Sequence, residues 1–192
     1  MPPEPQVRSA RRADAPHLAA FVDLASEGLA RRIWAAVAEP GEDLLAVGIR
    51  RAERDDADFS WRNALMAELD GAVAGGVVGY RLDAPDGPDD DMPPLARPLV
   101  ALERIAAGTW YVNVLATYPE MRRRGVAGAL LAASVRRAGG EPLSLIVGDG
   151  NTAARAVYAR HGFVERARRP VAGDGDWRGG SRDWVLMLRE GG

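Results

Sequence analysis

The chain contains no cysteine among its 192 residues, and this absence decides how it can be held together. Disulfide bonds and thiolate zinc sites cannot form, and a cysteine nucleophile is excluded. A chain of this length buries roughly 70% of the surface that it exposes when unfolded, so one packed core suffices. We therefore expect a single domain over residues 1–192. The lack of cysteine is compatible with a reducing compartment, and we expect a cytoplasmic protein.

The charged residues exclude several further classes of function. All 25 basic residues are arginine, so Walker-type phosphate loops and Schiff-base catalysis, which need lysine, cannot operate. The net charge of −2 argues against nucleic acid as a partner. With only His17 and His161, we expect no metal site. The longest weakly polar stretches have about ten residues, far fewer than the ~20 that span a bilayer, so we expect no membrane segment.

Apolar periodicity and turn residues predict seven strands and six helical regions. Asp14 is expected to cap the first helix, and Asp70 with Gly71 is expected to form a two-residue hairpin turn. Acidic and proline residues over about 83–98 predict an exposed loop, and a glycine-rich link covers 172–181. The expected strands are 6–10, 63–69, 72–80, 110–117, 143–147, 163–169 and 184–188. The expected helices are 14–27, 29–37, 43–54, 98–106, 125–138 and 151–160. This order predicts an α+β, or mixed α/β, sheet with helices on its faces.

The most informative segment runs from Tyr111 to Leu131. A strand leads through a turn at Pro119 into three consecutive arginines and a glycine, and a helix follows. The first amides of a helix lack intrahelical acceptors, and their dipole favours negative charge. Neighbouring arginines add charge-assisted hydrogen bonds. The segment therefore predicts a cradle for an anion such as a phosphate.

A second segment, Ser144 to Phe163, predicts a strand, a polar turn and a helix. Asn151, Ala154 and Tyr158 stand at positions i, i+3 and i+7, so they share one face of that helix. An amide at its start and a phenol two turns later could address one extended ligand. The same phenol could equally be a packed aromatic side chain with a hydrated hydroxyl.

These two segments resemble the acetyl-coenzyme A binding motifs of the GNAT superfamily of N-acetyltransferases. The pattern Arg/Gln-x-x-Gly-x-Gly/Ala is met by Arg122, Gly125 and Ala127. The pattern Asn-x-x-Ala-x-x-x-Tyr, followed by Gly-Phe, is met by Asn151, Ala154, Tyr158, Gly162 and Phe163. The match covers residues 111–163, and the two motifs stand in the family's order. The resemblance implies a mostly antiparallel twisted sheet of about six to seven strands flanked by helices.

The resemblance also implies a role for each matching position. The backbone of Leu115, Ala116 and Thr117 would pair with the pantetheine arm of acetyl-coenzyme A. Asn151 and Tyr158 would flank its thiol end, with Ala154 between them and Tyr158 as general acid. The acceptor would be a primary amine of a small molecule or peptide, and the protein a monomer or homodimer. The residues that would hold the pyrophosphate are Arg122, Arg123, Arg124, Gly125, Val126, Ala127 and Gly128.

The two motifs do not identify the general base that would deprotonate the amine. Some family members carry a glutamate on the strand before the cradle, whereas this strand offers Asn113, a polar contact for substrate that cannot take up a proton. Glu68, Glu103 or a water chain could substitute. A relative that binds coenzyme A without catalysis, as a sensor or structural element, is therefore the alternative.

A dinucleotide-binding interpretation has one point in its favour. Gly148, Gly150 and Ala153 satisfy Gly-x-Gly-x-x-Ala between a strand and a helix. However, only 42 residues follow Gly150, too few to complete a doubly wound sheet. That interpretation would also leave the arginine-rich cradle unexplained.

Overall fold

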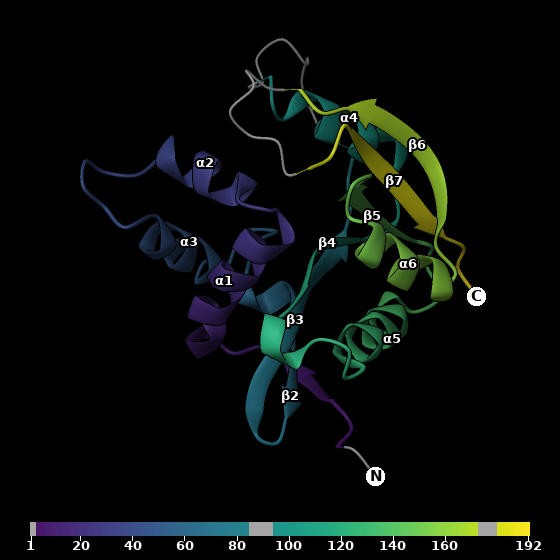
Figure 1. Ribbon diagram of the computed structural model, residues 1–192, viewed down its shortest axis with the longest axis horizontal. Helices are drawn as coiled ribbons and strands as arrows, with labels where there is room; N and C mark the ends of the chain where they lie inside the picture. Colours follow the sequence, from purple (N-terminus) through teal and green to yellow (C-terminus); the bar gives the residue numbers. More distant parts are fainter. Residues whose placement is uncertain (1–2, 85–93, 173–179) are drawn as a thin grey trace. The chain divides into compact units, whose positions relative to one another are not determined.

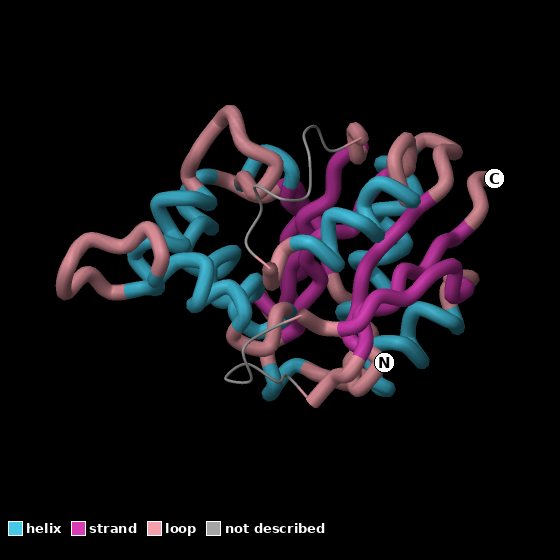
Figure 2. Tube along the Cα trace, turned by 90° about the horizontal axis from the view of Figure 1, so that it is seen from above, coloured by secondary structure: helices cyan, strands magenta, loops and turns pink. Residues whose placement is uncertain are grey.

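The computed structural model describes residues 3–84, 94–172 and 180–192, in which six α-helices and seven strands are found. Figure 1 labels the helices and most of the strands, and Figure 2 separates helices from strands by colour. The helices are α1 (Ala15–Ala25), α2 (Leu29–Ala35), α3 (Leu44–Ala52), α4 (Arg97–Ile105), α5 (Val126–Ala138) and α6 (Thr152–Arg160). The strands are β1 (Gln6–Ser9), β2 (Ala64–Leu69), β3 (Ala72–Arg81), β4 (Trp110–Thr117), β5 (Leu143–Gly148), β6 (Val164–Pro170) and β7 (Asp183–Arg189).

The strands form a sheet in the order β1-β2-β3-β4-β5-β7-β6. The pairs β1–β2, β2–β3, β5–β7 and β6–β7 are antiparallel, whereas β4 and β5 are parallel. This is the mixed α/β architecture with a mostly antiparallel sheet that the sequence predicts. The expected hairpin is confirmed, because Asp70 and Gly71 have φ angles of 52° and 78° between β2 and β3.

Two expected irregular segments fall largely outside the described residues. Residues 85–93 of the acidic loop and 173–179 of the glycine-rich link belong to this undescribed part. The C-terminal end of the expected loop is helical, since α4 begins at Arg97. The first helix ends at Ala25, two residues before its expected end, and left-handed backbone follows at Glu27 and Gly28.

The contacts divide the chain into two compact units, and each has its own core. The first comprises the chain up to Gly79 together with Asn113–Ser134. In this unit α1 packs on β3, because a Cβ added to Gly76 would lie 2.7 Å from the ring of Phe21. Helices α1, α2 and α3 share a cluster around the buried Trp34, whose ring lies over Gly48 of α3.

The second unit comprises Tyr80–Val112 and Val135–Gly192. Its strands β5, β7 and β6 lie side by side, with Leu145 opposite Met187 and Arg168 opposite Val185. Leu143, Leu186 and Phe163 are buried in it. A buried hydrogen bond of 2.6 Å joins the hydroxyls of Thr109 and Ser144.

The side chain of Asp14 corrects one expectation, because it does not cap α1. A 3₁₀ turn at Arg12–Asp14 gives Asp14 helical backbone, and its carboxylate turns back along the chain. It accepts hydrogen bonds from the Arg11 amide at 2.7 Å and from the Arg8 guanidinium at 2.8 and 3.0 Å. Burial alone would raise the pKa of Asp14, but these hydrogen bonds hold it below its ordinary value.

We predict that Asp14→Asn lowers the free energy of unfolding by about 2 kcal/mol near neutral pH, because the half-buried guanidinium of Arg8 loses one of its two carboxylate partners and keeps only Glu68. A carboxylate with a lowered pKa stabilises the fold above its unfolded pKa of about 4 and loses this effect as the pH falls through the folded pKa. The difference between wild type and variant should therefore shrink below about pH 4. Urea unfolding at both pH values measures this.

The matched control for this prediction is Asp56→Asn, which removes a carboxylate paired with Arg54 on the exposed surface. That change should leave the stability nearly unaltered. Equal losses in the two variants at neutral pH would contradict a special role for the Arg8–Asp14 pair.

Candidate functional site

The loop from β4 to α5 leads into a helix start at the position where the sequence predicts the anion cradle. Arg123 and Gly125 have left-handed backbone, with φ angles of 60° and 82°. Helix α5 begins at Val126, and the Gly125 carbonyl accepts a hydrogen bond of 3.0 Å from the Ala129 amide. The amides of Val126, Ala127 and Gly128 are therefore the first of the helix, and they have no acceptor within it. Such amides favour an anion at this end.

Gly75 of β3 lies beneath this cradle. A Cβ at Gly75 would lie 2.6 Å from the Ala116 carbonyl oxygen and 2.8 Å from Cγ1 of Val126. Only glycine therefore lets β3 approach both the end of β4 and the first residue of α5. The sequence motifs do not point to Gly75. The sequence does place two consecutive glycines, Gly75 and Gly76, in the middle of a predicted strand, and such a pair indicates close packing against the strand.

The three arginines of the cradle differ in their surroundings. Arg122 and Arg123 are exposed. Arg124 forms an ion pair of 3.0 Å with Asp70 in the β2–β3 turn, and its Nη1 also lies 3.3 Å from the sulfur of Met121. Because both partners of the ion pair are largely exposed, we expect little net stabilisation from it. A bound anion could therefore compete with Asp70 for Arg124.

Strand β4 presents the residues expected to bind the pantetheine arm. Ala116 is buried, whereas Leu115 and Thr117 are half-buried and Asn113 is exposed. The parallel pairing with β5 involves the beginning of β4, where Trp110 lies opposite Leu143. The expected pantetheine residues follow that paired stretch along the strand.

In the second unit, Asn151 has a structural role besides the expected one. Its Oδ1 accepts a hydrogen bond of 3.1 Å from the Ala154 amide, so Asn151 caps α6. The cap fixes where α6 begins. Asn151 thus stands just before α6, whereas Ala154 and Tyr158 lie within the helix.

Tyr158 is buried, and its ring lies 6.0 Å from that of Phe163. Burial raises the pKa of the Tyr158 phenol to about 12. The hydroxyl therefore stays protonated throughout the physiological range. A protonated phenol can donate a proton or a hydrogen bond, which suits a general acid and excludes a general base near neutral pH.

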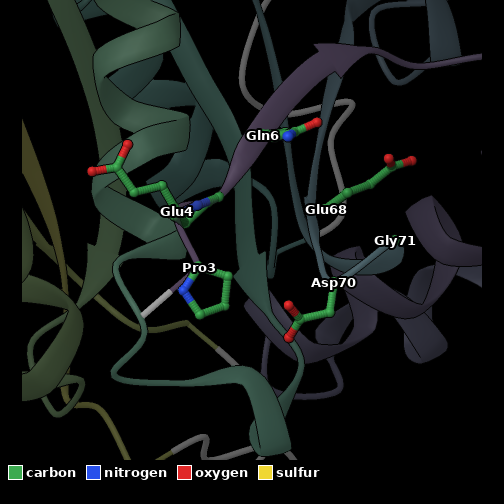
Figure 3. Close-up of a pocket in the computed structure, with 7 residues that line it drawn as sticks. Pro3, Glu4, Gln6, Glu68, Asp70 and Gly71 are labelled. Atoms are coloured by element: carbon green, nitrogen blue, oxygen red, sulfur yellow. The ribbon is translucent and has the colours of Figure 1, made fainter. Parts of the chain in front are cut away.

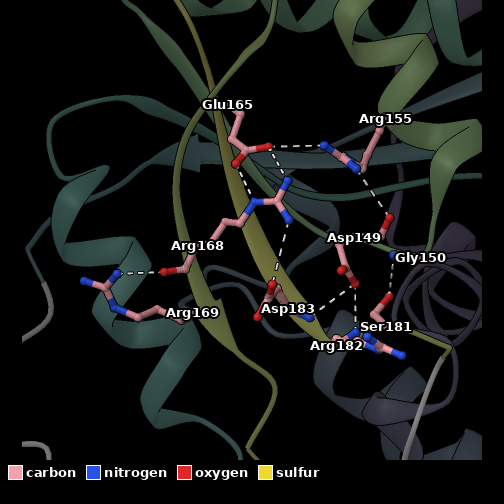
Figure 4. A network of polar contacts seen from close by, with 9 residues as sticks. All are labelled: Asp149, Gly150, Arg155, Glu165, Arg168, Arg169, Ser181, Arg182 and Asp183. Atoms are coloured by element: carbon pink, nitrogen blue, oxygen red, sulfur yellow. Dashed lines mark hydrogen bonds and ion pairs between the residues drawn. The ribbon is translucent and has the colours of Figure 1, made fainter.

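The turn between β5 and α6 packs against residues 180–183 of the same chain, at the place where a dinucleotide would bind in the alternative interpretation. A Cβ at Gly150 would lie 2.6 Å from the carbonyl oxygen of Gly180, and one at Gly148 would collide with Ser181. The Asp149 carboxylate accepts hydrogen bonds from the amides of Arg182 and Asp183, at 2.8 and 3.2 Å (Figure 4). Both glycines of the Gly-x-Gly-x-x-Ala pattern are thus explained by packing within the second unit.

A network of charges continues from this turn across the second unit (Figure 4). Glu165 of β6 pairs with Arg155 of α6 at 3.2 Å and accepts a hydrogen bond of 2.7 Å from Nη2 of Arg168. The Arg168 hydrogen bond lowers the pKa of Glu165. Arg168 also lies 3.7 Å from Asp183 of β7. These contacts join the helix that carries Tyr158 to the strands beside it.

The two carboxylates considered as general bases both have partners. The Glu68 carboxylate lies 2.6 Å from Nε of Arg8 in the first unit. Glu103, in the second unit, is hydrogen-bonded to the buried phenol of Tyr111, whose pKa is raised mainly by burial and also by the charge of Glu103. Each carboxylate is thus already engaged in a contact with another side chain.

A pocket of about 460 Å³ lies elsewhere in the first unit, beside β1 and the hairpin turn (Figure 3). None of the residues predicted to bind the coenzyme lines it, and of the two carboxylates considered as general bases only Glu68 does. Two of its acids are Glu68 and Asp70, which pair with Arg8 and Arg124. Its lining consists of Pro3, Glu4, Pro5, Gln6, Glu68, Asp70 and Gly71.

The described part of the chain comprises residues 3–84, 94–172 and 180–192. Within these ranges no three His, Asp or Glu side chains gather in a way that could hold a metal ion. In the same residues no helix combines the length and the apolar character needed to cross a membrane.

Comparison with solved structures supports the fold. A protein from Corynebacterium glutamicum described as histone acetyltransferase HPA2 and related acetyltransferase is 23% identical, with a TM-score of 0.65, and the match covers 98% of this chain and 97% of that one. A ribosomal-protein-alanine N-acetyltransferase from Brucella melitensis is also 23% identical, with a TM-score of 0.61 and coverage of 96% and 99%. An N-acetyltransferase from Staphylococcus aureus is 17% identical, with a TM-score of 0.63 and coverage of 95% and 99%.

At these identities the solved structures establish the fold alone. No curated protein matches the sequence. The model of the Acetyltransferase (GNAT) family, however, matches residues 33–163, which is more than half of the chain and includes both the cradle and α6. The chain is therefore a member of the GNAT acetyltransferase family, and the resemblance inferred from Arg122–Ala127 and Asn151–Phe163 is confirmed.

Proposed function

We propose that this protein transfers an acetyl group from acetyl-coenzyme A to a primary amine of a small molecule or peptide. The acetyl group would pass directly to the amine while both substrates are bound, with no acyl-enzyme. The observation that carries the proposal is the start of α5, where Gly125 and Arg123 turn the backbone and Gly75 makes room beneath. Such a helix start suits the pyrophosphate of the coenzyme.

The residues of the first unit would bind and polarise the coenzyme. Acetyl-coenzyme A supplies an activated acyl group, so the protein has mainly to position it for attack. The amides of the first turn of α5 hold the pyrophosphate, and exposed Arg122 and Arg123 add charge. The backbone of Leu115, Ala116 and Thr117 pairs with the pantetheine arm. An amide at Leu115 or Ala116 donates to the thioester carbonyl oxygen, where negative charge develops during attack.

The residues of the second unit would act at the thiol end. Asn151 and Ala154 contribute to coenzyme binding from the first turn of α6. Tyr158 donates its proton to the sulfur as the thiol departs, which requires a phenol that is still protonated at neutral pH. With a pKa of about 12 the Tyr158 phenol is protonated at neutral pH, as an ordinary tyrosine is, so its proton is present for this step.

A coenzyme A-binding sensor or structural protein remains the second candidate, and one observation favours it. Asn113 cannot take up a proton, and both Glu68 and Glu103 already have partners. Catalysis would then need a base elsewhere, such as a water chain. A panel of amines with free thiol as the readout separates the candidates: thiol release with any amine supports the transferase, whereas coenzyme binding without release supports the sensor.

We predict that Gly125→Glu weakens coenzyme A binding at least roughly tenfold, because it adds a negative charge and strains left-handed backbone at the proposed pyrophosphate site. Calorimetry with coenzyme A measures the affinity. Gly139→Glu is the matched control, because Gly139 follows the other end of α5 with a φ of 62° and open space around its Cα. It should cost similar stability but leave the affinity unchanged. Equal affinities in the two variants would contradict the proposed pyrophosphate site.

For Tyr158→Phe we predict a turnover roughly 10²-fold lower with nearly unchanged coenzyme affinity, because general acid catalysis is lost and the ring is kept. The measurements are steady-state kinetics with an amine from the panel and calorimetry with coenzyme A. Because the phenol pKa is about 12, wild-type activity should show no alkaline loss from this group below about pH 10. Wild-type turnover in the variant would remove Tyr158 from the mechanism.

A further inference from the structure

Two polar aromatic side chains in the first unit join α1 to the chain that follows β4. Nδ1 of His17 lies 2.7 Å from the hydroxyl of Tyr118, with the bond partly buried. The phenol ring of Tyr118 also packs on Phe21, with ring centroids 4.7 Å apart. No function was assigned to either residue of this pair, and the proposed chemistry uses neither.

Tyr118 occupies the first position of the cradle loop, and its backbone is held on both sides. Its amide donates to the Ala74 carbonyl on β3 at 2.9 Å, and its carbonyl accepts from the Met121 amide at 2.9 Å. A 3₁₀ turn at Pro119–Met121 follows Tyr118 directly, and the left-handed Arg123 and Gly125 complete the loop before α5. Its course therefore depends on how firmly its first residue is placed.

His17 provides a fixed partner because α1 is itself fixed against the sheet. The ring of Phe21, one helical turn after His17, covers Gly76 of β3 so closely that no Cβ fits there. The start of α1 is tied to β1 by the Arg8–Asp14 ion pair. The Tyr118 phenol, whose pKa is raised by burial and by Glu120, stays protonated and can donate to the imidazole.

We propose that His17 and Tyr118 are positioning residues for the pyrophosphate-binding loop. Their hydrogen bond fixes Tyr118, the first residue of the loop, relative to α1, and this strengthens coenzyme binding. This inference rests on the proposed function, because the loop is taken to bind the coenzyme. The pair acts through backbone placement and touches no reacting atom.

The test is a double-mutant cycle in the full chain, with the dissociation constant of coenzyme A measured by calorimetry. His17→Phe and Tyr118→Phe each keep an aromatic ring and remove the hydrogen bond. We expect each to weaken binding roughly fivefold, the effect of about 1 kcal/mol. The double variant should be no weaker than either single one, because both changes break the same bond.

A conservative variant and a control separate positioning from general stability. His17→Asn sets an amide group where Nδ1 stood, at the same number of bonds from the backbone, and should restore most of the affinity. Arg31→Gln breaks the exposed pair that Arg31 makes with Asp23 of α1 and should leave affinity unchanged. Thermal unfolding of every variant without coenzyme verifies that it is folded. If Tyr118→Phe does not fold, the comparison of His17→Phe with His17→Asn still decides.

The outcomes distinguish this inference from the function on which it rests. If wild type does not bind coenzyme A, the proposed function fails and this inference with it. If wild type binds and His17→Phe binds equally well, the function stands and the positioning role is overturned. Additive losses in the double variant, or no recovery in His17→Asn, would likewise overturn it.

Discussion

The first turn of α5 is the feature on which the account of this protein depends. A helix cannot satisfy its own first amides, and here they follow two left-handed residues that aim the chain into the helix. The close approach of β3 at Gly75 fixes where this helix begins relative to β4. The cradle is therefore built from backbone, and side chains around it adjust its charge.

The second unit supplies a different kind of chemistry. Tyr158 lies on a helix that Asn151 caps and that Arg155 ties to β6. Burial raises the pKa of its phenol, and the protonated hydroxyl can donate a proton or a hydrogen bond at neutral pH. No equally clear proton acceptor stands on β4, where Asn113 is exposed. The acceptor amine and its base are thus the least determined part of the chemistry.

Local patterns were enough to predict most of the elements and the family. Some features depend only on residues that are neighbours in the sequence, so local patterns predict them. They are the Asp70-Gly71 turn, the extent of β4 and the spacing of Asn151 and Tyr158. Asp14 was wrongly expected to cap α1, because its partner Arg8 comes from a strand. The roles of Gly75 and His17, and the hydrogen bonds from the amides of residues 182–183 to Asp149, depend on contacts between distant parts of the chain. A single sequence does not reveal such contacts.

The most direct test of the central claim is an NMR titration of the ¹⁵N-labelled protein with coenzyme A. If the start of α5 grips the diphosphate, the amide signals of Val126, Ala127 and Gly128 should shift most, and coenzyme fragments without phosphate should leave them in place. Saturable binding that leaves these three amides unmoved would contradict the account.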